Sequence, residues 1–344
     1  MALLSVEATS FARLLTDAIR EGTDVYKPEP VGERWAWRRA TTESLGASGL
    51  SLGPARASEP VKGLAFPPRG QVADFFKKGD GAEPGKAILV GVRACDLAAL
   101  RVLDHIFLSE PFRDPHYAAR RERMLVVSAD CTGPYEVCFC TFVEGAPHPT
   151  AGYDLNLSEV AGRLVVETGS EKGEKFVEAH RGEFRDASDV ERSGREEARR
   201  KVQAELEAKV RSQLLDFKDK VRHITRGREE HAVWAARAQD CVECGACNFV
   251  CPTCHFFYLL DVEDASGVKR FANWDSCLYP SFARVAGGAN PRERRAERLL
   301  NRFEKKFSFF CDTMDALACT GCGRCVEACA GKIDLREVLK ELAR

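Results

Sequence analysis

The sequence has neither a long apolar run nor an excess of charge of one sign. No stretch of its 344 residues approaches the roughly 18 consecutive apolar residues that a membrane-spanning helix needs. With 51 Lys and Arg against 52 Asp and Glu, the chain is almost neutral, and we expect no general affinity for nucleic acid or anionic lipid. Residues 1–7 lack the basic and apolar segments of a signal peptide, so none is expected.

The sequence also lacks the motifs of a self-contained redox enzyme. No G-x-G-x-x-G follows an apolar strand pattern, so we place neither a nicotinamide nucleotide nor a flavin in this chain. The histidines stand apart from any group of carboxylates or cysteines that would make a general base. His255, beside Cys254, is expected to pack in the interior. We therefore expect a chain that is not catalytic alone.

Cysteine, by contrast, is abundant: the chain has 15 cysteines, and eight of them form two runs of the form C-x2-C-x2-C-x3-C. In proteins with two [4Fe-4S] clusters, the first three cysteines of such a run hold one cluster and the fourth holds the other. The spacing thus predicts two [4Fe-4S] clusters. The predicted ligands are Cys241, Cys244, Cys247 and Cys329 for the first, and Cys319, Cys322, Cys325 and Cys251 for the second.

A pair of four-cysteine zinc sites is the alternative interpretation of these runs. It is disfavoured because a zinc ribbon uses two cysteines per knuckle, whereas each run here has four. Pro252 follows the first run, as is usual in cluster proteins, while Ala330 follows the second and affects only the exit of that turn. So many thiols in cluster spacing favour a reducing compartment, and we expect a cytoplasmic protein.

The N-terminal half predicts a mixed α/β domain. Residues 87–92 read as a buried strand, residues 96–107 as a helix, and residues 124–127 as a second strand. Strand, helix and strand in this order make a crossover between parallel strands, whose carboxyl ends lie at the same edge of the sheet.

Four further cysteines follow these two strands. Cys95 comes after the first strand, Cys131 after the second, and Cys138 and Cys140 lie within ten residues of Cys131. Arg93 could offset the charge of four thiolates. We predict that the four cysteines hold a third metal centre, another [4Fe-4S] cluster, with zinc or reduced structural thiols as the alternatives.

The remaining patterns are helical, apart from short strands. The overall prediction is an α+β chain: an N-terminal α/β domain over residues 1–230 and an all-helical, ferredoxin-like two-cluster domain over residues 231–344. Helices are expected at 4–20, 173–181, 202–224 and 291–310, and strands around Trp35 and Trp37 and at 163–168.

Several longer motifs resemble one family. These motifs are Cys251-Pro-Thr-Cys254-His, Trp274-Asp-Ser-Cys277, Gly287-Gly-Ala-Asn-Pro-Arg292 and Gly91-Val-Arg-Ala-Cys95-Asp, together with Cys138-Phe-Cys140 and the second cysteine run. They are similar to the β subunit of cytoplasmic sulfhydrogenases and related nickel–iron hydrogenases, and equally to the A subunit of anaerobic sulfite reductase.

The resemblance implies an electron-transfer subunit. Its partners would be a flavin- and NAD(P)H-binding reductase subunit on one side and the small and large hydrogenase subunits on the other. A sirohaem-binding sulfite reductase subunit is the alternative terminal partner. Cys254, Cys277 and Cys311 lie outside both ligand sets, and we expect buried thiols beside the clusters, with ligation by Cys254 in place of Cys251 as the alternative.

Overall fold

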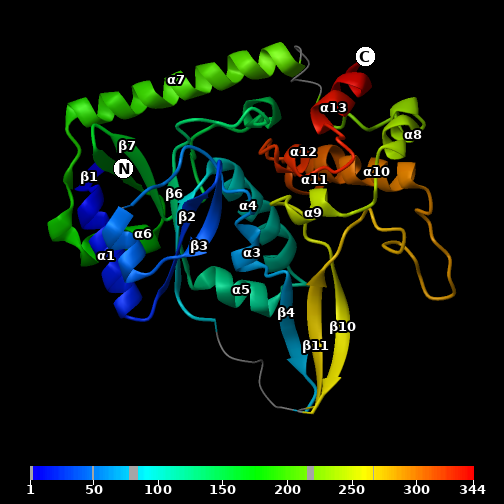
Figure 1. Ribbon diagram of the computed structural model, residues 1–344, viewed down its shortest axis with the longest axis horizontal. Coiled ribbons are helices and arrows are strands. Elements are labelled where there is room, and N and C mark those ends of the chain that lie inside the picture. The colour runs from blue at the N-terminus through cyan, green and yellow to red at the C-terminus, as the bar shows by residue number, and fades with distance from the viewer. Residues whose placement is uncertain (1–2, 49, 77–83, 215–220, 266) are drawn as a thin grey trace. The chain divides into compact units, whose positions relative to one another are not determined.

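The computed structural model describes residues 3–48, 50–76, 84–214, 221–265 and 267–344 (Figure 1). The chain folds into two compact units, and both are discontinuous in sequence. The first unit contains residues 1–61, 83–136 and 145–206, and the second contains residues 62–82, 137–144 and 207–344. Residues 207–230, which the sequence analysis assigns to the N-terminal domain, thus lie in the second unit.

An eight-stranded mixed sheet forms the centre of the first unit, in the order β3-β2-β5-β6-β7-β8-β1-β9. The four strands β2, β5, β6 and β7 run parallel to their neighbours within this set, and the outer pairings are antiparallel. The strands are β1 (Leu3–Glu7), β2 (Asp24–Val31), β3 (Arg34–Arg39), β5 (Ala87–Val92), β6 (Met124–Ala129), β7 (Leu155–Val160), β8 (Arg163–Thr168) and β9 (Arg185–Asp186).

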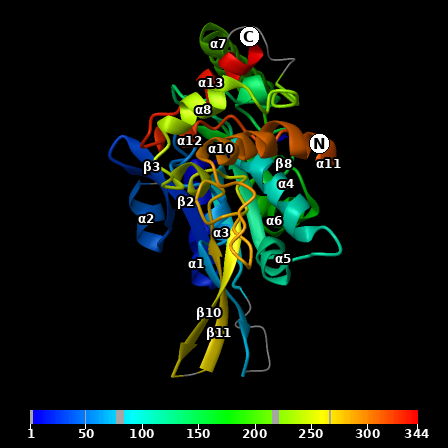
Figure 2. The ribbon, with the colours of Figure 1, turned by 90° about the vertical axis from the view of Figure 1, so that its right-hand side faces the viewer.

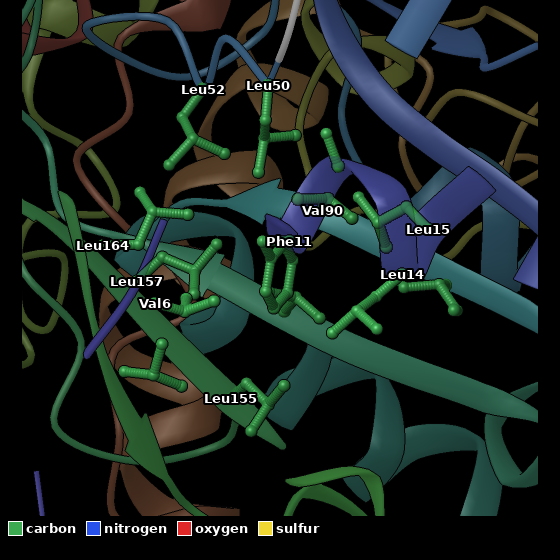
Figure 3. Close-up of a cluster of buried hydrophobic side chains, with 14 of the residues drawn as sticks. Val6, Phe11, Leu14, Leu15, Leu50, Leu52, Val90, Leu155, Leu157 and Leu164 are labelled. Atoms are coloured by element: carbon green, nitrogen blue, oxygen red, sulfur yellow. The ribbon is translucent and has the colours of Figure 1, made fainter. Parts of the chain in front are cut away.

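Helices cover this sheet, with α1 and α2 on one side and α4 and α5 on the other (Figure 2). Phe11, Leu14 and Leu15 of α1 pack into an apolar cluster with buried strand residues such as Val90 and Leu157 (Figure 3). The helices are α1 (Ala8–Arg20), α2 (Thr42–Ser48), α4 (Ala94–Leu108), α5 (Pro115–Glu122), α6 (Glu171–Ala179) and α7 (Asp189–Leu214), whose last residues belong to the second unit.

The predicted strand–helix–strand crossover is confirmed. Strands β5 and β6 pair in parallel, and α4 lies between them in the chain. The strand expected around Trp35 and Trp37 is β3, at the edge of the sheet. The carboxyl ends of β5 and β6 therefore lie at one edge, and Cys95 and Cys131 directly follow them.

The second unit combines short helices with a three-stranded antiparallel sheet of order β10-β11-β4 (Figure 1). Its elements are α3 (Lys62–Ala65), β4 (Arg69–Asp74), the 3₁₀ helix η1 (Cys140–Val143), α8 (Ala232–Gln239), α9 (Ala246–Phe249), β10 (Phe257–Asp264), β11 (Gly267–Trp274), α10 (Arg295–Glu304), the π-helical turn η4 (Lys305–Phe309), α11 (Phe310–Met314), α12 (Arg324–Glu327) and α13 (Leu335–Ala343).

The prediction that residues 231–344 are all-helical is wrong, because β10 and β11 form a hairpin there. The apolar run at the start of β10 contains the aromatic residues Phe257 and Tyr258, which favour extended structure. Strand β11 then pairs with β4, a segment nearly two hundred residues earlier in the chain. Such a long-range pairing leaves no local sequence signal.

Two predicted helices differ in extent. The helix expected at 202–224 begins earlier, as α7 at Asp189, and is described only to Leu214, because residues 215–220 lie outside the described part of the chain. The helix expected at 291–310 starts at Arg295 and passes through η4 into α11. Within the described residues, no helix is both long and apolar enough to cross a membrane.

A buried carboxylate fixes the start of α7 to the sheet. Ser188 and Glu191 form a reciprocal cap, since each side chain accepts a hydrogen bond from the backbone N–H of the other. The Glu191 carboxylate also accepts hydrogen bonds from Ser5 in β1 (2.6 Å) and from Arg185 in β9 (2.8 and 2.9 Å). The Arg185 hydrogen bond is the largest effect holding the pKa of Glu191 below its usual range.

We expect Glu191→Gln to lower the free energy of unfolding of the first unit by about 2 kcal/mol at pH 7, because charge-assisted hydrogen bonds are lost. A depressed carboxyl pKa contributes stability above the unfolded value of about 4.3 and loses it as the pH falls toward the folded value. The difference between the urea midpoints of wild type and variant should therefore decrease progressively as the pH falls below about 4. Glu171→Gln, at an exposed pair with Lys175, should behave as wild type; a difference independent of pH would contradict the assignment.

Candidate iron–sulfur site

The first cysteine run forms a tight loop that leads into a short helix. Cys241 follows the end of α8, and Gly245 is the N-cap of α9 with a φ of 72°. A Cβ atom at Gly245 would lie 2.9 Å from both Ser276 Cβ and the Tyr279 hydroxyl. Glycine is required here, because the backbone must take a left-handed conformation in a space closed by side chains.

The second run repeats this design. Gly321 and Gly323 have φ values of 64° and 71°, and Gly323 is the N-cap of α12. Residues 137–144 cover this loop: Phe139 N donates to Gly321 O at 2.8 Å, and a Cβ atom at Gly321 would collide with the backbone of Cys140. The two loops meet where α9 and α12 pack together.

The cysteines of the two predicted sets line two separate cavities of the second unit. The first cavity is lined by Cys241, Cys244, Cys247 and Cys329, and Cys325 also reaches its wall. The second cavity is lined by Cys251, Cys319, Cys322 and Cys325. The structure thus brings together each set that the sequence predicts, including the exchange of the fourth cysteine between the runs. Taken over the described residues, no three Cys, His, Asp or Glu side chains converge on a point that would hold a single ion.

Apart from the cysteines, the wall of the first cavity is largely apolar, and the wall of the second combines apolar with polar side chains. Leu278, Leu299 and Phe303 line the first cavity, and Phe139 and Leu335 line the second. Burial raises the pKa of Cys247 to about 12 and that of Cys325 to about 11. Without iron these groups are thiols at neutral pH, so thiolate ligation would require bound metal to displace their protons.

Polar atoms on the cavity walls are left without protein partners. Arg302 Nη1 and Thr320 Oγ1 are buried and have no hydrogen-bond partner among the described groups. Arg302 lines both cavities and Thr320 lines the second. Such orphaned donors are costly unless an acceptor is present, and the sulfides and ligating sulfurs of an iron–sulfur cluster are acceptors. The donor set and these atoms therefore fit two cubane clusters.

Two buried lysines lie near the first cysteine run, and one of them, Lys306, lines the second cavity. Lys306 Nζ donates to Thr253 Oγ1 at 2.5 Å, and Lys62 Nζ donates to the backbone oxygens of Asn248 (3.1 Å) and Cys254 (3.0 Å). Burial alone would lower the pKa of Lys306, but the negative charge of the Cys251 thiolate, whose own pKa is lowered, raises it overall. Sequence reasoning missed Lys62, which is distant in the chain. It also missed Arg302 and Lys306, whose i, i+4 spacing on a predicted helix could have indicated one basic face.

Cys254, Cys277 and Cys311 lie outside the two ligand sets, and all three are buried. Cys254 and Cys277 are buried, as expected, and Cys277 Sγ accepts a hydrogen bond from Asn248 Nδ2 at 3.2 Å. Cys311 donates to Phe307 O at 3.3 Å within its own helical turn. His255 is packed between the rings of Phe256 and Phe310, and burial lowers its pKa to about 4. It is therefore neutral at pH 7.

The four N-terminal cysteines fall into different units. Cys95 lies in the first turn of α4 and Cys131 follows β6, both in the first unit. Cys138 and Cys140 lie in the second unit, where Cys138 Sγ is 3.9 Å from Cys322 O. The buried Arg93 guanidinium donates to the backbone oxygens of residues 52, 53, 55 and 130 and so anchors a loop. The prediction of a common metal centre stays a prediction.

Comparison with known proteins agrees with the site. Residues 240–333 match the family model described as "4Fe-4S dicluster domain". The chain is 33% identical over 301 residues to "Sulfhydrogenase 2 subunit beta" of Pyrococcus furiosus, covering 85% of each chain. The chain belongs to the sulfhydrogenase β-subunit family. This confirms the resemblance seen in the sequence motifs.

Comparison of this sulfhydrogenase β-subunit family member with solved structures also gives a match of low structural similarity. It is a chain of the F420-reducing [NiFe] hydrogenase complex from Methanosarcina barkeri, with 12% sequence identity and a TM-score of 0.38. The match covers 62% of this chain and 91% of that chain.

Gly321→Ala tests the loop around the second cavity. The added Cβ would displace either this loop or residues 137–144, so we expect the iron content of anoxically purified protein to fall by about four per chain. Gly287→Ala is the matched control, since Gly287 also has a positive φ of 88° but open space around its Cβ position. Full iron content in Gly321→Ala would show that the second loop is not the ligand-bearing wall.

Proposed function

We propose that this chain is an iron–sulfur electron-transfer subunit of a nickel–iron hydrogenase of the sulfhydrogenase type. It relays electrons between a flavin- and NAD(P)H-binding subunit and the catalytic hydrogenase subunits. The observation that carries the proposal is the pair of cysteine-lined cavities, which share Cys325 and Arg302 in their walls. The name of the Pyrococcus furiosus relative supports the hydrogenase assignment.

The proposed ligands follow the cavities. Cys241, Cys244, Cys247 and Cys329 would hold one [4Fe-4S] cluster, and Cys251, Cys319, Cys322 and Cys325 the other. When bound, each cluster would accept and release one electron at a time. The chain's own residues exclude water through Leu278, Phe303 and their apolar neighbours and place positive charge beside the thiolates.

The alternative is that this chain is the electron-transfer subunit of a sulfite reductase. In that case a sirohaem-binding subunit would take the place of the hydrogenase subunits as its partner. A complex purified through this chain from its source cells should contain nickel and flavin if the hydrogenase proposal holds. Sirohaem in place of nickel would transfer the same relay role to sulfite reduction. Recovery of the chain alone, with hydrogenase activity in other fractions, would contradict both assignments.

Cys325→Ser should abolish NAD(P)H-linked hydrogenase activity of the complex, because Cys325 is a proposed ligand whose side chain lines both cavities. The dye-linked activities of the flavin and hydrogenase subunits should persist, since neither uses the relay. Cys311→Ser is the matched control: it changes another buried cysteine, which lies outside both proposed ligand sets and donates to Phe307 O, and should keep coupled activity. Coupled turnover in Cys325→Ser would mean that electrons bypass this cluster.

The predicted third metal centre has its own test in the full chain. If Cys95 and Cys131 bind a cluster with Cys138 and Cys140, wild-type protein should contain about twelve iron, and Cys95→Ser about eight. The control Cys311→Ser should retain all twelve. About eight iron in both wild type and Cys95→Ser would leave two clusters only, and one zinc per chain lost in Cys95→Ser would assign a structural zinc site.

A further inference from the structure

Arg302 is a buried cation on the wall of both cavities. It lies in α10, and only 5% of its surface is exposed. Its Nε donates to Cys247 Sγ at 3.4 Å and its Nη2 donates to Cys247 O at 3.2 Å, while Nη1 has no partner among the described groups. The guanidinium thus contacts one proposed ligand, and its Nη1 remains available to donate a further hydrogen bond.

Arg298 provides a contrast one turn earlier on the same helix. It is also buried, but its guanidinium pairs with the carboxylate of Glu243 and donates to three backbone oxygens. Within the described part of the chain, no carboxylate pairs with Arg302. Its neighbours in the cavity walls are instead cysteines of both proposed sets: Cys247, to whose Sγ it donates, and Cys325, which lines both cavities with it. An unpaired buried guanidinium requires negative charge beside it.

We propose that Arg302 is the shared counter-charge of the two clusters. This inference rests on the proposed function, because it requires both cavities to hold clusters. A cubane with four thiolates is an anion, and its reduction potential depends on nearby charge and on hydrogen bonds to its sulfurs. A guanidinium in both walls raises both potentials and stabilises the electron on either cluster.

The electron balance is simple. With both clusters bound, one would be oxidised by one electron as the other is reduced, and no covalent bond would form or break. The donor and acceptor would be the partner subunits of the proposed complex. Because Arg302 lies in the walls of both cavities, its charge would shift both potentials in the same direction and favour neither direction of transfer.

Lys306 acts on one side only. Its side chain lines the second cavity but not the first, and it donates to Thr253 Oγ1, which lies 3.3 Å from Cys251 Sγ. Loss of this charge should therefore shift the potential of the second cluster alone. Variants of Arg302 and Lys306 can therefore distinguish a charge that shifts both cluster potentials from a charge that shifts only one.

Redox titration of the full chain, monitored by EPR after anoxic purification, tests the proposal. Arg302→Gln should lower both midpoint potentials, changing each reduced-to-oxidised ratio about tenfold, which is about 59 mV for one electron. Arg302→Lys keeps the charge and should titrate close to wild type. Lys306→Gln should shift one of the two signals, and Arg294→Gln, which removes an exposed charge from the start of the same helix, should shift neither.

Iron and sulfide contents distinguish the failures. Absence of clusters from the wild-type protein would overturn the proposed function itself. A fully loaded Arg302→Gln that titrates as wild type, or a Lys variant shifted as far as the Gln variant, would overturn only the role of Arg302. If Arg302→Gln loses iron while Arg302→Lys retains it, the charge is required for loading, which supports the inference. Loss of iron from both variants would assign a packing role and overturn it.

Discussion

The burial of many thiols together with unpaired cations is the constraint on which the second unit depends. Burial raises the pKa of Cys247 and Cys325 even beside Arg302, so these residues would become thiolates only when bound metal displaces their protons. Arg302 and Lys306 place positive charge in the cavity walls from adjacent turns of one helical segment. Neither the cations nor the thiolates would be stable in this interior without the other, so the site is designed as one electrostatic unit.

The parts of the site that lie close together in sequence could be predicted. Spacing within each cysteine run reports directly on a tight loop and a helix start, and the exchange of Cys251 and Cys329 between sets follows from that geometry. The crossover of β5, α4 and β6 was equally accessible, because its strands and helix are continuous patterns. Membership of the sulfhydrogenase β-subunit family was visible in the same local motifs.

Features built from distant segments could not be predicted. Strand β4 completes the sheet of β10 and β11, and Lys62 reaches the backbone of Asn248 across 186 positions. The inward orientation of the basic residues of α10 and η4 could not be predicted for a different reason. A charged side chain on an amphipathic helix normally faces water, and only the fold shows that Arg302 faces inward. Whether Cys95 and Cys131 hold one metal centre together with Cys138 and Cys140 stays a prediction, because the two pairs belong to different units.

The second unit's assembly from three chain segments has a consequence for biosynthesis. Residues 62–82 and 137–144 leave the ribosome long before either cysteine run is made, yet Cys140 forms the surface against which Gly321 closes. Domains generally fold as units as synthesis proceeds from the N-terminus. This unit must instead wait for the last part of the chain, so the early segments stay unpaired until then. Insertion of iron and sulfide at the proposed second site would therefore have to follow synthesis of the second cysteine run.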